Sequence, residues 1–310
     1  MHTFFHTTDE VLGDARNRYF GRAFQAYHIK LKSFIIDNSI ISGVFKIDYD
    51  GPARPRHETV HLGSIEYTAL ALLLAGFGLS KLVGLSIEQI NMATLDRMSF
   101  KISSILCIGE VSFAIQIKES GRDNSSKQGS YSTFQLTVGF TTISIRIDHQ
   151  GKRYHWLTAH QSLDPFSEQL YTIGYKKRTL KIHTITLNLH SNSIQGHVHC
   201  PRQYPENEID GLSSSRSILL PTDALQVFGQ LMQTLLYQKM NSNREQCPNI
   251  WLRRMDLEVH APQLEEHCIS RISFDKIKRI NQRKESWQMI DLSGNVGTYR
   301  GKFQIAHKLS

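Results

Sequence analysis

Two carboxylates stand at corresponding places near the starts of two apolar stretches of this chain. Glu66 lies at the start of the stretch 64–82 and Asp223 at the start of the stretch 222–240, and the two acids are 157 positions apart (223 − 66). A carboxylate at a helix start can take a proton from a hydroxyl, while the neighbouring backbone N–H groups can bind a developing oxyanion. Both acids could also do no more than stabilise their helices.

Two histidines precede the first apolar stretch and are further candidates for acid–base chemistry. His57 and His61 titrate near neutral pH, so either could act as a base or polarise a carbonyl group. His61 is the stronger catalytic candidate because it stands five positions before Glu66 (66 − 61). His57 and Tyr67, the residue that follows Glu66, are candidates for substrate binding. A loop histidine can equally be a surface or packing residue.

Amide and guanidinium groups near the second stretch could bind a substrate. Gln226 and Gln230 share a helical face with Asp223, where they could orient a substrate or bond within an interface. Arg253 and Arg254 begin a strand, and an arginine pairs well with phosphate. Neighbouring residues of a strand point to opposite faces, so we expect at most one of them, Arg254 in our prediction, to face a cleft.

Other chemistries leave weak traces in the sequence. His197, His199 and Cys200 are close together, but a zinc site needs a fourth ligand, and we expect chance clustering, with neither a metal nor a cofactor. Motifs for a serine nucleophile elbow, a phosphate-binding loop and a zinc protease are missing from the sequence. The four cysteines are widely spaced, which predicts reduced thiols without a disulfide.

An internal duplication predicts how these residues are positioned. Residues 29–47 and 182–198 each alternate on a strand period around a turn, which indicates two hairpins. Each hairpin precedes an apolar helix, at 64–82 and 222–240, which starts at a Ser or Thr able to cap it. Matching strands then begin at 95–102 and 252–259, followed by further alternating stretches at 110–118, 133–148, 268–276 and 299–307.

The apolar helices decide the fold class. Residues 69–75 are apolar on all sides, so this helix must be enclosed by a sheet rather than laid on a surface. This arrangement is typical of the hotdog fold. We therefore predict an α+β double hotdog, in which two antiparallel sheets each wrap a long apolar helix and the sheets of neighbouring modules are continuous. The modules are expected at residues 1–160 and 161–310, and residues 196–217 are expected to form a surface insertion.

Composition limits the classes of protein to consider. The chain has 310 residues and a net charge of +8, with the basic residues spread along it and no nucleic-acid recognition motif, so we expect no nucleic-acid partner. Its apolar stretches are too short or too interrupted by glycine to predict a membrane span, and the first residues lack the features of an export signal. We expect a cytoplasmic protein, and further oligomerisation stays open.

Two stretches of the chain resemble a known protein family, and the length of the chain agrees with a resemblance from end to end. Residues 8–21, TDEVLGDARNRYFG, resemble the opening of the bacterial avirulence protein D family, and residues 61–66, HLGSIE, resemble its helix entry. The family is associated with syringolide-type elicitors. The resemblance therefore implies an enzyme that joins a β-ketoacyl group to a pentulose such as xylulose, with later ring closures.

The paired helices are also similar to the A-factor synthases, double-hotdog proteins that transfer a β-ketoacyl chain from a thioester to a small hydroxylated phosphate. This similarity implies an acyl carrier protein or coenzyme A thioester as co-substrate. Polyketide dehydratases share the architecture, but the Gly-rich loop expected after their histidine is missing after His57 and His61. We expect acyl transfer, with a non-catalytic acyl- or lactone-binding regulator and a 3-hydroxyacyl thioester dehydratase as the alternatives.

Overall fold

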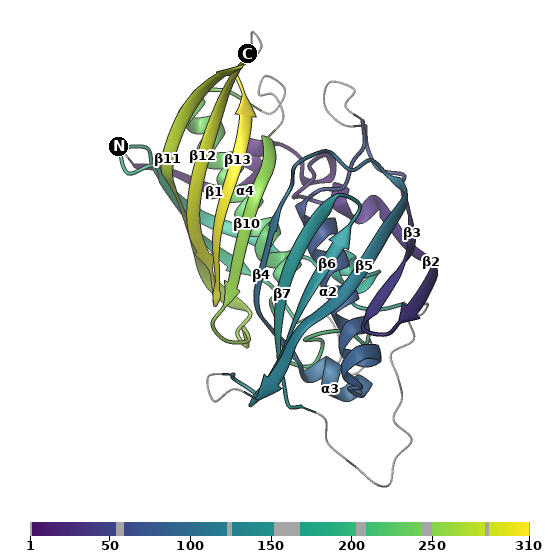
Figure 1. The fold of residues 1–310 in the computed structure, drawn as a ribbon. Helices are drawn as coiled ribbons and strands as arrows, with labels where there is room; N and C mark the ends of the chain where they lie inside the picture. Colours follow the sequence, from purple (N-terminus) through teal and green to yellow (C-terminus); the bar gives the residue numbers. More distant parts are fainter. Residues whose placement is uncertain are drawn as a thin grey trace.

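The computed structural model describes residues 2–53, 59–122, 126–151, 168–202, 209–243, 250–282 and 285–309. In this part of the chain, thirteen antiparallel strands form one sheet that curves around two long helices (Figure 1). The helices are α1 (Asp9–Leu12), α2 (Ser64–Gly78), α3 (Ile87–Met92) and α4 (Pro221–Met240), and α2 continues as a π-helical turn, Leu79–Val83.

The first six strands in chain order come from the first half of the chain. They are β1 (His2–Thr7), β2 (Tyr27–Asp37), β3 (Ile40–Tyr49), β4 (Thr94–Lys101), β5 (Gly109–Arg122) and β6 (Ser130–Val138). The others are β7 (Thr141–His149), β8 (Lys181–Asn188), β9 (Ser193–His199), β10 (Ile250–Val259), β11 (His267–Gln282), β12 (Glu285–Val296) and β13 (Tyr299–Lys308). Their order across the sheet is β1-β8-β9-β11-β12-β13-β10-β4-β7-β6-β5-β3-β2.

The duplication predicted from the sequence appears at the centre of this sheet. Strands β4 and β10 pair antiparallel, and Ser99 lies directly opposite Asp256. These two residues have the same separation in sequence as Glu66 and Asp223. Equivalent residues therefore face each other across a local two-fold axis. The two halves therefore share one continuous sheet, and the prediction of two sheets is corrected to one.

Each long helix is enclosed by its own half of the sheet, as predicted. Helix α2 contacts β5, β6 and β7, helix α4 contacts β9, β11 and β12, and the two helices contact each other. Every residue of α2 is buried, because leucine and alanine cover all its sides. By length and composition alone, residues 64–83 could cross a membrane, but 89% of their most apolar window is buried inside this fold.

The helix starts differ from the prediction in one respect. Ser64 and Thr222 lie inside their helices, and the capping positions belong to Gly63 and Leu220. Neither of these residues has a side-chain oxygen to accept the free N–H groups. Instead, the acid in the first turn reaches back in both helices. The N–H of Gly63 donates to Glu66, and the N–H of Leu220 donates to Asp223, each at 2.9 Å.

The amino-terminal strand crosses between the two halves. Strand β1 pairs with β8 at the edge of the second half, although we assign residues 1–160 to the first module. The division at residues 160 and 161 lies outside the described residues. Cys107, Cys200 and Cys268 are free thiols, and Cys247 also lies outside the described part.

A buried histidine at the end of β7 makes the stability of the fold depend on pH. The side chain of His149 is 2% exposed, its Nδ1 accepts the N–H of Gly151 at 3.0 Å, and its Nε2 lies 2.9 Å from the Ser132 hydroxyl. Burial lowers the pKa of His149 below its usual 6.5. The neutral ring is thus the form that fits this site.

We expect the free energy of unfolding to fall as the pH falls below about 6.5. In this range the unfolded chain binds a proton at residue 149 that the folded chain does not, so protonation favours unfolding. The contribution of His149 is at most about 1.4 kcal/mol per pH unit. Denaturant unfolding at pH 7 and pH 5 checks this: His149→Gln should have the shallower pH dependence. The buried Asp148 titrates in both proteins and cancels, so equal slopes would contradict the prediction.

Candidate functional site

One apolar pocket lies between the start of α2, the middle of α4 and the start of β10. It encloses about 1020 Å³, including the solvent space at its mouth. Its apolar walls include Leu225, Phe228 and Met232 of α4 and Trp251 of β10. The pocket therefore lies between the two halves and takes its walls from both of them.

The polar end of the pocket is formed around the start of α2. Tyr19, His61 and Ser64 all line the pocket there. The hydroxyl of Tyr19 donates to Glu66 and accepts the N–H of Ile65 at 3.0 Å. Glu66 is fully buried behind this tyrosine and is not among the pocket-lining residues. It therefore holds Tyr19 and the helix start in place rather than contacting the pocket itself.

A glycine allows this close approach of Tyr19. A β-carbon at Gly63 would lie 2.2 Å from the Cζ atom of the Tyr19 ring, closer than van der Waals contact allows. Any larger residue at position 63 would have to displace the ring from Glu66. The glycine in the stretch 61–66, which contributes to the family resemblance, is thus required by the packing of the pocket wall.

The backbone around His61 fixes the orientation of its ring. Nδ1 lies 3.0 Å from the carbonyl oxygen of Thr59, so Nδ1 carries the proton and donates it. In the neutral ring, Nε2 is then the nitrogen with a lone pair. The carbonyl oxygen of His61 accepts the hydroxyl of Tyr27 at 2.6 Å, which also fixes the backbone here. The backbone contacts therefore hold His61 in the pocket lining.

Helix α4 holds the amino-terminal segment that forms one wall. The hydroxyl of Thr8 donates to the side-chain oxygen of Gln230 at 2.9 Å, and Arg18 donates to the same oxygen at 3.4 Å. The amide nitrogen of Gln230 donates to the carbonyl oxygen of Phe20 at 3.0 Å. Gln230 is not among the pocket-lining residues. Its contacts instead position Tyr19 and Phe20, and both of these residues line the pocket.

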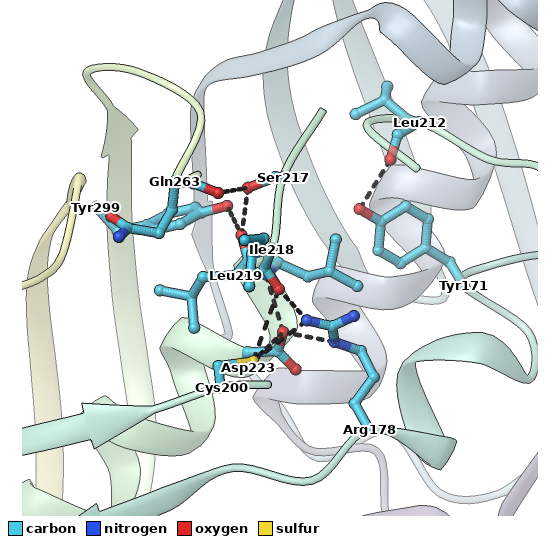
Figure 2. A network of polar contacts seen from close by, with 11 residues as sticks. Tyr171, Arg178, Cys200, Leu212, Ser217, Ile218, Leu219, Asp223, Gln263 and Tyr299 are labelled. Carbon is cyan, nitrogen blue, oxygen red and sulfur yellow. Dashed lines mark hydrogen bonds and ion pairs between the residues drawn. The ribbon is translucent and has the colours of Figure 1, made fainter. Parts of the chain in front are cut away.

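The start of α4 contains a buried ion pair. Arg178 donates through Nε to Asp223 at 2.7 Å, and Asp223 is fully buried (Figure 2). Burial raises the pKa of Asp223, and the contacts with Arg178 and the N–H of Leu220 act in the opposite direction. Burial, together with the negative charge of Asp223, also raises the pKa of the Cys200 thiol to about 12. Cys200 is therefore an unreactive thiol at neutral pH.

A segment of the chain covers this ion pair. Tyr171 donates to the carbonyl oxygen of Leu212 at 3.0 Å, and Tyr299 donates to that of Leu219 at 2.7 Å (Figure 2). Ser213 is also buried and donates to the carbonyl oxygen of Ala93. The prediction of a surface insertion at 196–217 is therefore wrong for residues 196–199, which belong to β9, and for residues 211–213, which are buried. Ile218, whose carbonyl oxygen accepts from Arg178, covers the start of α4, whereas the start of α2 borders the pocket.

The structure brings only part of the predicted site together. His61 and Tyr67 line the pocket, but Asp223 does not. Gln226 is buried away from the pocket, and its amide nitrogen has no hydrogen-bond partner among the described residues. His57 lies outside the described residues.

Only one of the two neighbouring arginines lines the pocket, as predicted, but the choice between them was wrong. Arg253 lines the pocket. Arg254 is exposed and donates through Nε to Asp256 at 2.8 Å. A bulge in β10 between Leu252 and Arg254 shifts its register against β13, and strand alternation alone cannot say which arginine then faces inward.

Sequence reasoning also missed Tyr19 and Ser64 as pocket residues. Tyr19 lies within the stretch 8–21 that carries the family resemblance, and this was the available signal. Ser64 was considered only as a cap for the helix. Both residues become candidates once the wall between the amino-terminal segment and α2 is known.

These features define a hotdog-type protein made of two fused modules, with a mainly apolar pocket between them. The chain belongs to the family of the Pseudomonas avirulence D protein (AvrD), whose family model matches residues 2–310, nearly the whole chain. The family resemblance seen in the sequence is thereby confirmed. No curated protein matches the chain.

Several solved structures are similar to the chain at low identity. An acyl-CoA thioesterase II, TesB2, from Mycobacterium marinum is 9% identical with a TM-score of 0.43, covering 90% of this chain and 95% of that one. A hot dog fold protein from Alicyclobacillus acidocaldarius is 11% identical with a TM-score of 0.40, covering 94% and 98%. The pyran synthase domain from module nine of the sorangicin pathway is 10% identical with a TM-score of 0.40, covering 90% and 97%. Similarity at this level carries no conclusion on activity or substrate.

Proposed function

We propose that the protein is an acyltransferase that moves a β-ketoacyl group from a thioester to a sugar-derived, xylulose-like hydroxyl. The product would be an acyl glycoside or lactone signal of the syringolide type. The observation that carries this proposal is one pocket with apolar walls and a polar end at the start of α2, where Tyr19, His61 and Ser64 meet. Family membership supports the choice of substrates.

The apolar part of the pocket suits an acyl chain. Leu225, Phe228 and Met232 present one face of α4 to it, and each methylene group of a chain buried there contributes about 0.8 kcal/mol. Arg253 lies in the same lining, where its guanidinium group can pair with a phosphate of the carrier. Coenzyme A and the phosphopantetheine of an acyl carrier protein both supply one, and both are cytoplasmic carriers.

The polar end suits direct transfer. Nε2 of His61 takes the proton from the acceptor hydroxyl as its oxygen attacks the thioester carbonyl carbon and forms the new C–O bond. The N–H of Ser64, in the first turn of α2, stabilises the negative charge that develops on the carbonyl oxygen. The C–S bond then breaks, and the leaving thiolate takes the proton back from His61. Glu66 and Tyr19 hold this helix start in position.

A product assay tests the proposal. The purified protein is incubated with β-ketoacyl-coenzyme A or β-ketoacyl carrier protein of several chain lengths and with xylulose, and the mixture is analysed by mass spectrometry. An ester of the expected mass, together with free thiol, supports acyl transfer. Free acid without ester would indicate hydrolysis instead, and no turnover with any chain length would contradict the proposal.

A non-catalytic acyl- or lactone-binding protein is the second candidate. The observation that favours it is that both helix-start acids are buried and bonded within the protein rather than lining the pocket. Tight binding of the same thioesters without turnover would identify this case. The position of Asp223 argues against a dehydratase, because its carboxylate is paired with Arg178 outside the pocket.

We expect a bulky residue in the α4 wall to shorten the acyl chain that binds. Met232→Trp should remove room for about two methylene groups and thus weaken binding of long chains about tenfold, with less effect on short chains. Calorimetric titration with acyl-coenzyme A thioethers of increasing length measures this. Met240→Trp, at the end of the same helix and outside the pocket lining, is the matched control. Equal losses at all chain lengths would contradict this placement of the acyl chain.

A further inference from the structure

Two histidines face each other on the second half of the sheet, outside the pocket lining. Strands β9 and β11 pair antiparallel with His199 directly opposite His267. Directly opposed residues of a ladder share a face, and here the two imidazole rings stack with centroids 4.4 Å apart and an interplanar angle of 6°. The backbone ladder therefore fixes a close pair of nitrogen ligands.

A carboxylate completes the cluster. Glu266 directly precedes β11 and is partly exposed, unlike the buried Glu66 and Asp223. Its Oε2 lies 3.8 Å from Nε2 of His199. One ligand atom from each of His199, Glu266 and His267 lies within 4.8 Å of the others. The stacked rings must turn out of their parallel planes for both nitrogens to reach the 2.0–2.2 Å bond lengths of one zinc ion.

Backbone contacts hold the carboxylate in this position. The N–H of Arg202 donates to Oε1 of Glu266 at 3.0 Å, which leaves Oε2 toward the histidines. The N–H of Cys200 donates to the carbonyl oxygen of Glu266 at 2.8 Å and ties the two strands together.

The cluster differs from the one that the sequence suggests. His197, His199 and Cys200 are neighbours in sequence, but the Cys200 thiol is buried against Arg178 and Asp223. The ring of His197 stacks instead on His183 of β8, with centroids 5.8 Å apart. The fold thus takes only His199 from that group and adds two ligands from a distant part of the chain.

We infer that His199, Glu266 and His267 form a binding site for a late first-row divalent cation, Zn²⁺ in the first place. Imidazole nitrogen suits Zn²⁺, Ni²⁺ and Cu²⁺, and two imidazoles with one carboxylate leave a fourth position for water. A bound ion would link β9 to the entry of β11. The inference is independent of the proposed acyl transfer, because none of the three residues is among the pocket-lining residues.

Calorimetric titration of the full chain tests the site. The protein must lack affinity-tag histidines and be dialysed against EDTA before ZnCl₂ is added. We expect one Zn²⁺ per chain and a thermal midpoint that rises with Zn²⁺ concentration. Loss of a hydrogen bond that only orients a metal ligand lowers metal affinity by about 10–100-fold. Loss of a ligand itself should cost at least as much, so His267→Gln and Glu266→Gln should each weaken Zn²⁺ binding about 100-fold or more.

The matched control is His190→Gln, which removes an exposed histidine of the β8–β9 turn outside the cluster. It should keep the affinity of the unaltered protein. His267 is exposed, so circular dichroism should show an intact fold in His267→Gln. The inference is overturned if the unaltered protein binds no Zn²⁺ saturably, or if His190→Gln and His267→Gln weaken binding equally, which would indicate scattered surface histidines.

Discussion

Asp223→Ala should lower the free energy of unfolding by about 3–5 kcal/mol. The substitution leaves the guanidinium group of Arg178 buried without its carboxylate, and Arg178 is only 7% exposed. It also removes the acceptor for the N–H of Leu220 at the start of α4. A buried charge without its partner cannot regain the solvation that it lost on folding, so this is the largest stability effect that we expect from one substitution.

Denaturant unfolding of three variants separates this explanation from a general loss of packing. Arg178→Met alone should cost a similar amount, whereas Asp223→Ala combined with Arg178→Met should cost less than the two single losses added, because no unpaired charge is left. Asp256→Ala, which breaks the exposed pair with Arg254, is the control and should cost under about 1 kcal/mol. Additive losses would rule out a coupled buried pair.

His61→Asn should lower the rate of acyl transfer by about 10²–10⁴-fold, the range that a general base contributes. The substitution removes the Nε2 lone pair, while an asparagine can still donate to the Thr59 carbonyl oxygen that fixes the residue. His61 is only half-buried, so the fold should be kept. Single-turnover measurements with a β-ketoacyl thioester and xylulose, together with binding of the thioester alone, test whether the loss lies in chemistry.

Two further variants complete the comparison with His61→Asn. His28→Asn removes a histidine paired with Asp50 outside the pocket lining and should leave the rate unchanged. Glu66→Ala removes the oxygen that accepts the Tyr19 hydroxyl and the N–H of Gly63, so it should disturb the pocket wall and weaken substrate binding as well as turnover. A rate unaffected by His61→Asn would assign the base to another group and contradict the proposed mechanism.

The features of the fold that were predictable are those that follow from residue periodicity. The hairpins β2–β3 and β8–β9 alternate over part of their length, and the run from Ala69 to Ala75 is apolar on every side, so strands and an enclosed helix could be predicted. The matching order of hairpin, apolar helix and strand in the two halves predicted the duplication, which places Glu66 and Asp223 at corresponding positions, and the pairing of β4 with β10 agrees with it.

Pairings between strands and side chains far apart in the chain could not be predicted from the sequence. Strand β12 was missed because Ser293, Gly294 and Asn295 are residue types typical of turns, although Ile290, Leu292 and Val296 keep a strand alternation. The expected single stretch at 133–148 is two strands with a turn at Gly139, where φ is +56°. No local pattern indicates that β1 pairs with β8. The same applies to the site: the burial of Asp223 depends on Arg178, 45 positions away in sequence.

The local two-fold axis between Ser99 and Asp256 has a consequence for how such a molecule can diverge. A single module that dimerised through this strand would carry two identical cavities, and any mutation would alter both at once. Covalent fusion removes that constraint. One copy can then keep a pocket at its helix start while buried residues such as Ile218 and Leu219 precede the other helix, so that asymmetry arises without loss of the shared sheet.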